Sequence, residues 1–366
     1  MKVDFRIKTS GFHGLFWLGA INAVFLTVTY LGAQIIENPS KPQSTNAGRV
    51  LNLKEVWRIT DESGAFFLKW PHELRIAPDG SIFLNEVGEF LKFSSDGKFL
   101  KNLYKKGAGP GEIQGEFTYH LRGDDVFVQD MNSQRLWRMD EDGAFKEQVD
   151  LSVKDYRGFL GVLPDGYLFL KSVWPPPAER TGRLLEILNS PVLVTRDGKR
   201  EQVLYTFRPR MFLAPQAARS WDYSALVPDD SGLNIFAYHG RDYLIEVLNV
   251  AKKQIVRRFT RKFPKVPYVE QSWEKDFSKK HGALKIQFDA DIQALYVNGP
   301  RLWVATAMED KAKGRLFDVF DSKGRYIDCF YLGAGRTLLA AWGDFLFMQE
   351  KNDDETLRIV KYKIEG

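Results

Sequence analysis

The sequence has a single cysteine, Cys329, and no aspartate, glutamate, lysine or arginine between residues 9 and 36. One cysteine excludes an internal disulfide, and with it a disulfide-stapled scaffold, but leaves export open. Cys329 stands in an apolar, strand-like run, so we expect a buried, unreactive thiol. The sequence also lacks the patterns G-x-S-x-G, H-E-x-x-H and C-x-x-C, which would indicate common hydrolase, metalloprotease and thiol redox sites.

The chain has little excess charge of either sign, because 52 lysines and arginines face 47 aspartates and glutamates. A nucleic-acid-binding domain usually concentrates its basic residues in one patch, and we expect no nucleic-acid partner. The densest basic run, residues 252–265, contains seven lysines and arginines and no acid. We interpret it as an outermost strand whose basic side chains block aggregation. Attraction to anionic lipid or polysaccharide is the alternative.

The uncharged N-terminal stretch contains an apolar core from Leu15 to Ile36, 22 residues long. A helix of this length reaches roughly 33 Å, enough for a hydrocarbon core of about 30 Å. Lys2, Arg6 and Lys8 precede it. The positive-inside rule therefore leaves the N-terminus in the cytoplasm and places the rest of the chain across the membrane.

Two fates of this segment remain open, an uncleaved transmembrane helix and a cleaved signal peptide. The first is favoured, because a signal peptide has a shorter apolar region and Leu31 is bulky for the −3 position of a cleavage site. We predict a membrane anchor or signal sequence over residues 1–37, a flexible tether over 38–48 and one domain over 49–366. The domain would be anchored to the inner membrane on its periplasmic or extracellular side, or secreted after cleavage.

Residues 49–366 consist of short runs of β-branched and aromatic residues separated by Asp-Gly turns, which predicts an all-β fold. One unit recurs six times: an apolar strand, a glycine-containing turn and a second strand that ends in a polar residue. The six units begin at His72, His120, Arg157, Ser224, Ile292 and Arg336. A second hairpin follows several of them, so each unit offers up to four strands.

Six units over these 318 residues give about 53 residues each, close to the roughly 40–50 of known propeller repeats. We therefore predict a six-bladed β-propeller of four-stranded antiparallel blades, preceded by one N-terminal transmembrane helix. The last unit lacks a fourth strand, and Arg49–Ile59 forms a strand without a unit. We expect that strand to pair near Leu357–Ile364 and close the ring.

The segment Leu91–Ile113 resembles bacterial six-bladed β-propeller proteins related to the NHL-repeat group. In that family a strand and Asp-Gly turn precede a Gly-x-Gly-Pro-Gly-Glu-Phe loop, which here is Gly107–Ile113 with isoleucine in the last position. The resemblance is strong over residues 70–150 and faint elsewhere. It implies an exported or membrane-associated propeller and no single agreed activity. We interpret the glycine-rich loop as a turn between blades, since it lacks the Lys-Ser/Thr of a phosphate-binding loop.

Two insertions interrupt the repeat. Residues 174–190 begin with a tryptophan and three prolines, whereas residues 269–284 contain no proline. The second is predicted to form a short amphipathic helix that uses Trp273 and Phe277.

Candidate ligand-binding residues cluster near the starts of the first strands, which line the channel of a propeller. They are His72, Glu73, His120, Arg122, Tyr223, Gln293 and Arg336. Their histidines and arginines favour an anionic or carboxylate-bearing ligand. We identify no metal ligands, no cofactor and no catalytic residues.

The predicted function is therefore a binding or scaffolding module for an unidentified protein, peptide or small anionic ligand. The alternative is a lactonase- or lyase-like enzyme with its site in the central channel.

Overall fold

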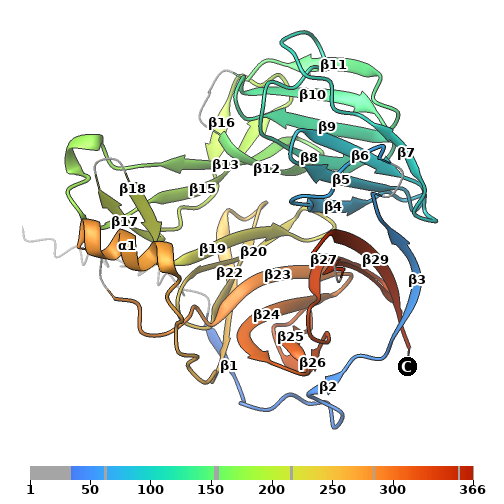
Figure 1. Cartoon of the computed structure of the whole chain (residues 1–366). Coiled ribbons are helices and arrows are strands. Elements are labelled where there is room, and N and C mark those ends of the chain that lie inside the picture. The colour runs from blue at the N-terminus through green and yellow to red at the C-terminus, as the bar shows by residue number, and fades with distance from the viewer. Residues whose placement is uncertain are drawn as a thin grey trace, which may run out of the picture. The chain divides into compact units, whose positions relative to one another are not determined.

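The structure is a computed structural model that describes residues 34–365 except 62–63, 152–155, 215–216, 283–284 and 353–354. It is almost entirely β-structure, as the sequence predicts (Figure 1). The strands form seven sheets, and the many four-stranded antiparallel sheets are consistent with a β-propeller.

Four sheets have four antiparallel strands each. Sheet 1 comprises β4 (His72–Ile76), β5 (Ile82–Glu86), β6 (Glu89–Phe93) and β7 (Phe99–Asn102). Sheet 2 comprises β8 (Phe117–Arg122), β9 (Asp125–Asp130), β10 (Arg135–Asp140) and β11 (Phe145–Val149). Sheet 3 comprises β12 (Tyr156–Leu163), β13 (Gly166–Val173), β15 (Leu188–Thr195) and β16 (Glu201–Val203). Sheet 6 comprises β27 (Thr337–Trp342), β28 (Phe345–Lys351), β29 (Leu357–Ile364) and β3 (Leu53–Ile59).

Two further sheets carry a fifth strand from the N-terminal part of the chain. Sheet 4 comprises β19 (Tyr223–Pro228), β20 (Asn234–Gly240), β21 (Leu244–Asn249), β22 (Gln254–Arg261) and β1 (Ile35–Asn38). Sheet 5 comprises β23 (Ile292–Asn298), β24 (Arg301–Asp310), β25 (Gly314–Phe320), β26 (Tyr326–Tyr331) and β2 (Arg49–Val50). The first strands of sheets 1 to 6 contact one another in the order β4, β8, β12, β19, β23, β27 and again β4. We call these six the inner strands.

In sheets 1, 2 and 6 the polar residue at the end of the second strand is a buried carboxylate, and it binds the segment that leads into the inner strand. Glu86 accepts hydrogen bonds from the backbone amides of Lys69 and Trp70, each at 2.9 Å. Asp130 accepts one from the amide of Gln114 at 2.9 Å. Glu350 plays the same part in sheet 6, where Arg336 donates to it. A buried carboxylate needs such donors to offset its desolvation, which explains why the repeat ends in a polar residue.

The predicted pairing of Arg49–Ile59 with the strand near Leu357–Ile364 is confirmed for Leu53–Ile59, whereas Arg49 and Val50 pair with β26 instead. β3 pairs antiparallel with β29, with Ile59 opposite Ile359 and Leu53 opposite Ile364. Trp57 of β3 also reaches sheet 1, where its indole Nε1 donates to the carbonyl of Ser95 at 3.0 Å. Gly97 in that turn has φ +82°, and a Cβ atom there would lie 2.8 Å from the Trp57 ring. Only glycine suits both the backbone angle and the close approach.

The predicted tether over residues 38–48 is not a free linker. β1 lies parallel to β22 from Ile35 to Asn38, and β2 lies parallel to β26. Between them, the amides of Ser44 and Gly48 donate to carbonyls of β26 at 2.9 and 2.8 Å. The outer strands of sheets 4 and 5 would otherwise leave backbone groups unpaired, so this part of the chain pairs with them. Two sheets thus gain a parallel strand that the sequence does not predict.

The predicted membrane segment, residues 15–36, lies outside the described residues except at its end, where Ile35 and Ile36 belong to β1. No helix within the described ranges is long and apolar enough to cross a membrane. The anchor boundary predicted at residue 37 therefore falls inside a strand.

The basic run 252–265 contains β22, as predicted, but β22 is outermost only in its first half, because β1 pairs with Arg258–Arg261. Its arginines are bonded within the protein. Arg258 binds Glu246 at 2.6 Å and Arg261 binds Asp318 at 2.6 Å, while Arg257 donates to the carbonyl of Ser322. These contacts join strands and sheets, so the three arginines of the run have structural partners.

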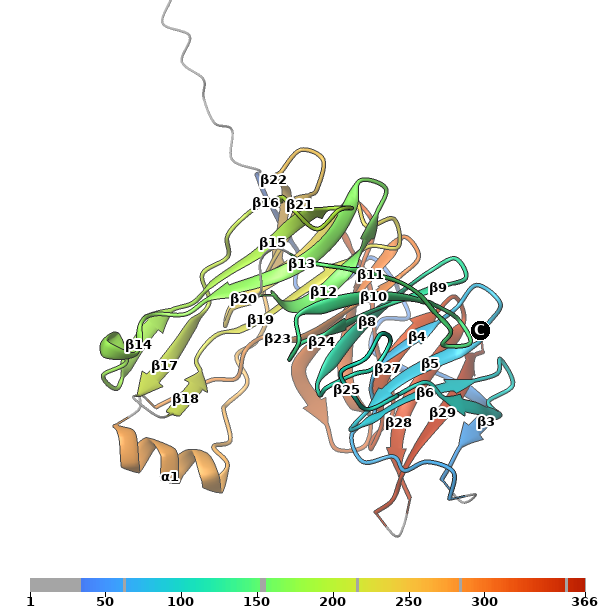
Figure 2. The same cartoon turned by 90° about the horizontal axis from the view of Figure 1, so that it is seen from above.

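The second insertion forms the predicted helix, α1 (Ser272–His281), which begins with a capping box between Gln271 and Glu274. Phe277 packs against Phe212 with ring centroids 6.0 Å apart, whereas Trp273 is 59% exposed. Phe212 belongs to the small seventh sheet, which comprises β14 (Arg183–Glu186), β17 (Arg210–Ala214) and β18 (Ala217–Ser220). Figures 1 and 2 both show α1 beside this sheet. A 3-10 turn, η1 (Pro177–Glu179), precedes β14.

Two smaller expectations also hold. Cys329 is buried, as predicted, and burial raises the pKa of its thiol. The loop Gly107–Glu112 closes on itself, because Glu112 accepts a hydrogen bond from the amide of Gly109 at 2.8 Å.

Candidate functional site

A cavity of about 770 Å³ is lined by residues from the inner strands of sheets 1 to 6. Small-molecule sites usually have volumes of roughly 300–1,000 Å³ and few, well-placed polar groups. This cavity has that size, and residues far apart in the sequence meet around it.

β-Bulges determine several of the side chains that line the cavity. The pairing register shifts in β4 between His72 and Arg75, in β12 on both sides of Gly158–Phe159, and in β27 between Leu338 and Ala340. A bulge re-aims a side chain that regular pairing would point elsewhere. Glu73, Arg157, Leu160 and Leu339 fall in these shifts, and all four line the cavity.

Glu73 also has an unusual backbone conformation, with φ +47°. A left-handed residue other than glycine costs free energy and is held by its surroundings. Here the hydroxyl of Tyr119, on the neighbouring inner strand, lies within hydrogen-bonding distance of the Glu73 carbonyl and 2.8 Å from that of Phe83. The guanidinium of Arg75 lies over the Tyr119 ring, 5.6 Å from its centroid. Tyr119 thus positions both charged residues of β4.

Three cavity-lining side chains carry buried polar atoms that have no hydrogen-bond partner within the described part of the chain. They are Glu73 Oε2, Arg75 Nε and His120 Nδ1. An unpaired buried polar atom costs about 1–3 kcal/mol, and such atoms are rare in native proteins. Glu73, Arg75 and His120 stand on two adjacent inner strands, so three of these costly atoms are concentrated in one part of the cavity wall.

The charge states of these residues reflect their burial. Burial raises the pKa of Glu73 above its usual range, although Arg75 and His72 act in the opposite direction. Burial, together with Arg75 and Arg122, lowers the pKa of His120 to about 3. His120 is therefore neutral at physiological pH and can accept or donate one hydrogen bond through a ring nitrogen.

Sheet 3 holds His120 in place. Its ring packs edge-on against Phe159 with centroids 6.1 Å apart, and a Cβ atom on Gly161 would come within 3.4 Å of it. On the same strand, Thr118 accepts a hydrogen bond at Oγ1 from the amide of Phe159 at 3.1 Å. The imidazole is thus fixed by packing, as a binding group needs to be.

The cavity contains only part of the predicted ligand-binding set. Glu73 and His120 line it, whereas the other five are not among the described residues that do: His72, Arg122, Tyr223, Gln293 and Arg336. Each of these five has another environment. His72 Nδ1 lies 2.8 Å from the carbonyl of Trp70, Gln293 donates to the carbonyl of Ala290 at 2.7 Å, and Arg336 donates to Glu350 at 3.0 Å. Arg122 is exposed and Tyr223 is partly buried.

The sequence analysis missed Arg75, Thr118 and Arg157, which also line the cavity. Thr118 could have been found, because it stands two positions before His120 on the same face of a strand. Arg75 could likewise have been found, because it stands two positions after Glu73. Arg157 could not, because it falls in a register shift of β12.

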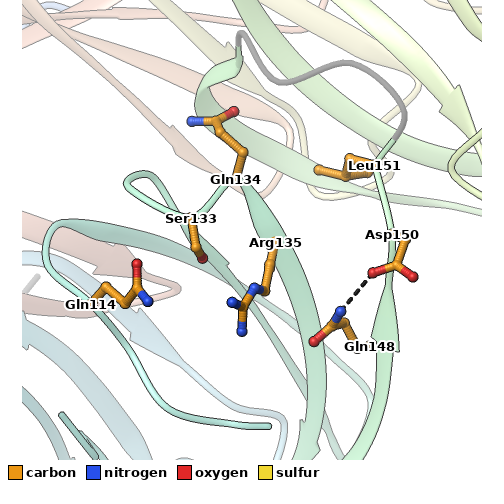
Figure 3. Close-up of a pocket in the computed structure, with 7 residues that line it drawn as sticks. All are labelled: Gln114, Ser133, Gln134, Arg135, Gln148, Asp150 and Leu151. Atoms are coloured by element: carbon orange, nitrogen blue, oxygen red, sulfur yellow. Dashed lines mark hydrogen bonds between the residues drawn. The ribbon is translucent and has the colours of Figure 1, made fainter. Parts of the chain in front are cut away.

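A second cavity, of about 360 Å³, lies beside sheet 2 and is lined by Gln114, Ser133, Gln134, Arg135, Gln148, Asp150 and Leu151 (Figure 3). Of its polar atoms, Ser133 Oγ is buried without a hydrogen-bond partner in the described chain, whereas others bind one another or the backbone. Gln148 donates to Asp150 at 2.6 Å, and Arg135 donates to the carbonyl of Ala108 at 2.8 Å. Because its groups are mostly engaged, this cavity is a weaker candidate than the central one.

In the ranges that the structure describes, no three histidine, cysteine, aspartate or glutamate side chains are grouped so as to hold a metal ion.

No protein-family model matches the chain, and no curated protein is significantly similar to it. Solved structures do match. A predicted exported protein from Bacteroides fragilis NCTC 9343 is 13% identical with a TM-score of 0.56, over 91% of this chain and 100% of that one. A member of the DUF4221 family from Bacteroides vulgatus ATCC 8482 is 11% identical with a TM-score of 0.53, over 87% of this chain and 99% of that one.

A gluconolactonase from Xanthomonas campestris is also similar, at 12% identity and a TM-score of 0.45, over 88% of this chain and 99% of that one. At these identities the likeness concerns the fold and leaves activity open.

Proposed function

We propose that the protein is an exported binding module that holds a small ligand in the central cavity of a six-bladed propeller. The six sheets whose inner strands contact one another in a closed series would be the blades. The small seventh sheet would combine β14, inserted within blade three, with β17 and β18, which connect blade three to blade four. The observation that carries the proposal is the group of unpaired polar atoms of Glu73, Arg75 and His120 in the cavity wall.

A binding role predicts that these groups cost stability in the free protein. Replacing Glu73 with methionine is expected to raise the free energy of unfolding by about 1 kcal/mol, because an apolar side chain has no missing partner. The matched control is Glu86→Met, which removes a buried carboxylate that accepts hydrogen bonds from three backbone amides, those of Lys69, Trp70 and Val87, and should cost about 2 kcal/mol or more. Urea unfolding of both variants measures the difference. If Glu73→Met destabilises the protein as much as Glu86→Met, Glu73 has a structural role and the proposal loses its support.

Export and anchoring belong to the same proposal. They rest on the uncharged apolar core from Leu15 and the basic residues before it, together with the likeness to a predicted exported protein. With a reporter fused after Gly366, we expect the reporter to be periplasmic and to sediment with membranes. Recovery in the soluble periplasm with a new N-terminus near Ala33 would instead show signal-peptide cleavage. A cytoplasmic reporter would contradict export itself.

A further inference from the structure

The two halves of the cavity wall differ in character. Sheets 1 to 3 contribute the charged and imidazole groups of the inner strands, namely Glu73, Arg75, His120 and Arg157. Sheets 4 to 6 contribute mainly aliphatic side chains from their inner strands, including Leu226, Leu295 and Leu339. The hydroxyl of Tyr296, on that second side, already donates to the carbonyl of Leu338 at 2.8 Å. The charged and imidazole groups of the inner strands therefore lie on one side of the cavity, together with apolar side chains such as Leu74 and Ile76. The inner strands of the facing side offer mainly apolar contact.

The polar side of the cavity favours an anion. Arg75 and Arg157 carry positive charge, His120 is neutral, and Glu73 is the one acid on these strands that lines the cavity in the described residues. A carboxylate matches the fork of an arginine, which can donate through Nε as well as a terminal nitrogen. Arg75 has that Nε free of partners within the described chain.

The acids at the other end of the cavity argue against a second negative group on the ligand. Asp229 and Asp230 follow β19 and line the cavity there. Asp229 is engaged in its own turn, where Asn234 donates to it at 2.8 Å. Burial and the neighbouring Asp229 raise the pKa of Asp230, as expected where another anion would be unfavourable.

We infer that the central cavity binds a monocarboxylate with a short aliphatic chain, its carboxylate on Arg75 and His120 and its chain against Leu226, Leu295 and Leu339. This inference rests on the proposed function and adds the chemical class of the ligand. An amphipathic molecule of this kind satisfies the polar side and buries apolar surface on the facing side at the same time.

The test is isothermal titration of the full chain in lipid nanodiscs, with empty nanodiscs as the blank, using octanoate, octylamine, acetate and glutarate. We expect saturable octanoate binding, with the other three at least tenfold weaker. Arg75→Met should weaken octanoate binding at least tenfold, and Arg75→Lys less, because lysine keeps the charge without the fork. Leu339→Asn should weaken it at least fivefold. Lys252→Met removes an exposed positive charge far from the cavity lining and should change it less than twofold.

The outcomes separate this inference from the proposed function. Two results would overturn the carboxylate assignment. One is that octylamine binds as tightly as octanoate. The other is that octanoate binding is unchanged in folded Arg75→Met and Arg75→Lys. A third result would be that acetate or glutarate binds as tightly as octanoate and depends on Arg75. The cavity would then still bind a ligand, but the assignment of an amphipathic ligand would be overturned. If no probe binds and Glu73→Met is as destabilising as Glu86→Met, both the inference and the proposed function fail.

Discussion

Deleting residues 1–60 is expected to abolish cooperative folding, whereas deleting residues 1–33 should leave the melting temperature of the remaining chain unchanged. The longer deletion removes β3, which is hydrogen-bonded along its length to β29. It also removes the buried side chains of Leu51 and Ile59, 7% and 3% exposed, and the Trp57 ring that packs on Gly97. Burial of such side chains contributes about 1.5–3 kcal/mol each. We expect a loss of about 5 kcal/mol or more, comparable with the stability of a whole domain.

A deletion of residues 1–48 separates two contributions to stability. One is the pairing of β3 with β29, and the other is the pairing of the preceding residues with the outer strands of sheets 4 and 5. This deletion keeps β2 and β3 but removes β1 and the amides that bind β26. It should therefore be less stable than the chain that lacks residues 1–33 and much more stable than the chain that lacks 1–60. Thermal and urea unfolding, followed by circular dichroism, rank the three proteins. Equal stability after the 1–48 and 1–60 deletions would show that β3 does not close the ring.

Replacing Arg261 with methionine is expected to destabilise the protein by about 3–5 kcal/mol. Arg261 ends β22 in sheet 4, and it donates to Asp318 in sheet 5 through Nε at 2.6 Å and a terminal nitrogen at 2.9 Å. The side chains of Arg261 and Asp318 are 5% and 0% exposed. Without the arginine, Asp318 keeps only the hydroxyls of Tyr243 and Tyr326, at 2.7 and 2.8 Å. A buried carboxylate that loses its cation is costly because water cannot replace it.

The surface pair Lys351–Glu355 provides the matched control. Its nitrogen and oxygen are also 2.6 Å apart, but the two side chains are 62% and 77% exposed. Lys351→Met should cost less than about 1 kcal/mol, since solvent screens an exposed pair. A double-mutant cycle with Arg261→Met and Asp318→Asn completes the test, because the two changes should be far from additive. Additive effects, or a cost of Arg261→Met no larger than that of Lys351→Met, would contradict this role of the pair.

Much of the fold could be predicted from the sequence because its signals are local. Asp-Gly turns mark where the chain reverses, and Gly80, Gly97 and Gly143 adopt the positive φ that such turns need. Alternation of apolar and polar residues predicts strands, since side chains of a strand point to opposite faces in turn. The pairing of β3 with β29 could also be predicted, because the last repeat lacks a fourth strand and the N-terminal strand belongs to no repeat.

The candidate site could be predicted only in part, because its composition depends on register. His120 was found, since β8 pairs regularly with β9. Glu73 was assigned to the cavity correctly, but it reaches the cavity through a bulge that the sequence does not reveal. Gln293 also falls at a register shift, and it turns back to Asp289 and Ala290. One residue of slip is enough to move a side chain from one face of a strand to the other.

By itself the sequence determined the strands, the turns between them and the repeat that makes the sheets alike, because each follows from the conformational preferences of neighbouring residues. The tertiary structure alone decided that residues 35–50 pair with the outer strands of sheets 4 and 5. It also decided that the arginines of β22 are bonded within the protein, and that charged and imidazole groups face mainly apolar inner strands across the central cavity. These features arise where segments distant in sequence meet, and there the pairing of backbone groups and the burial of charge outweigh local preference.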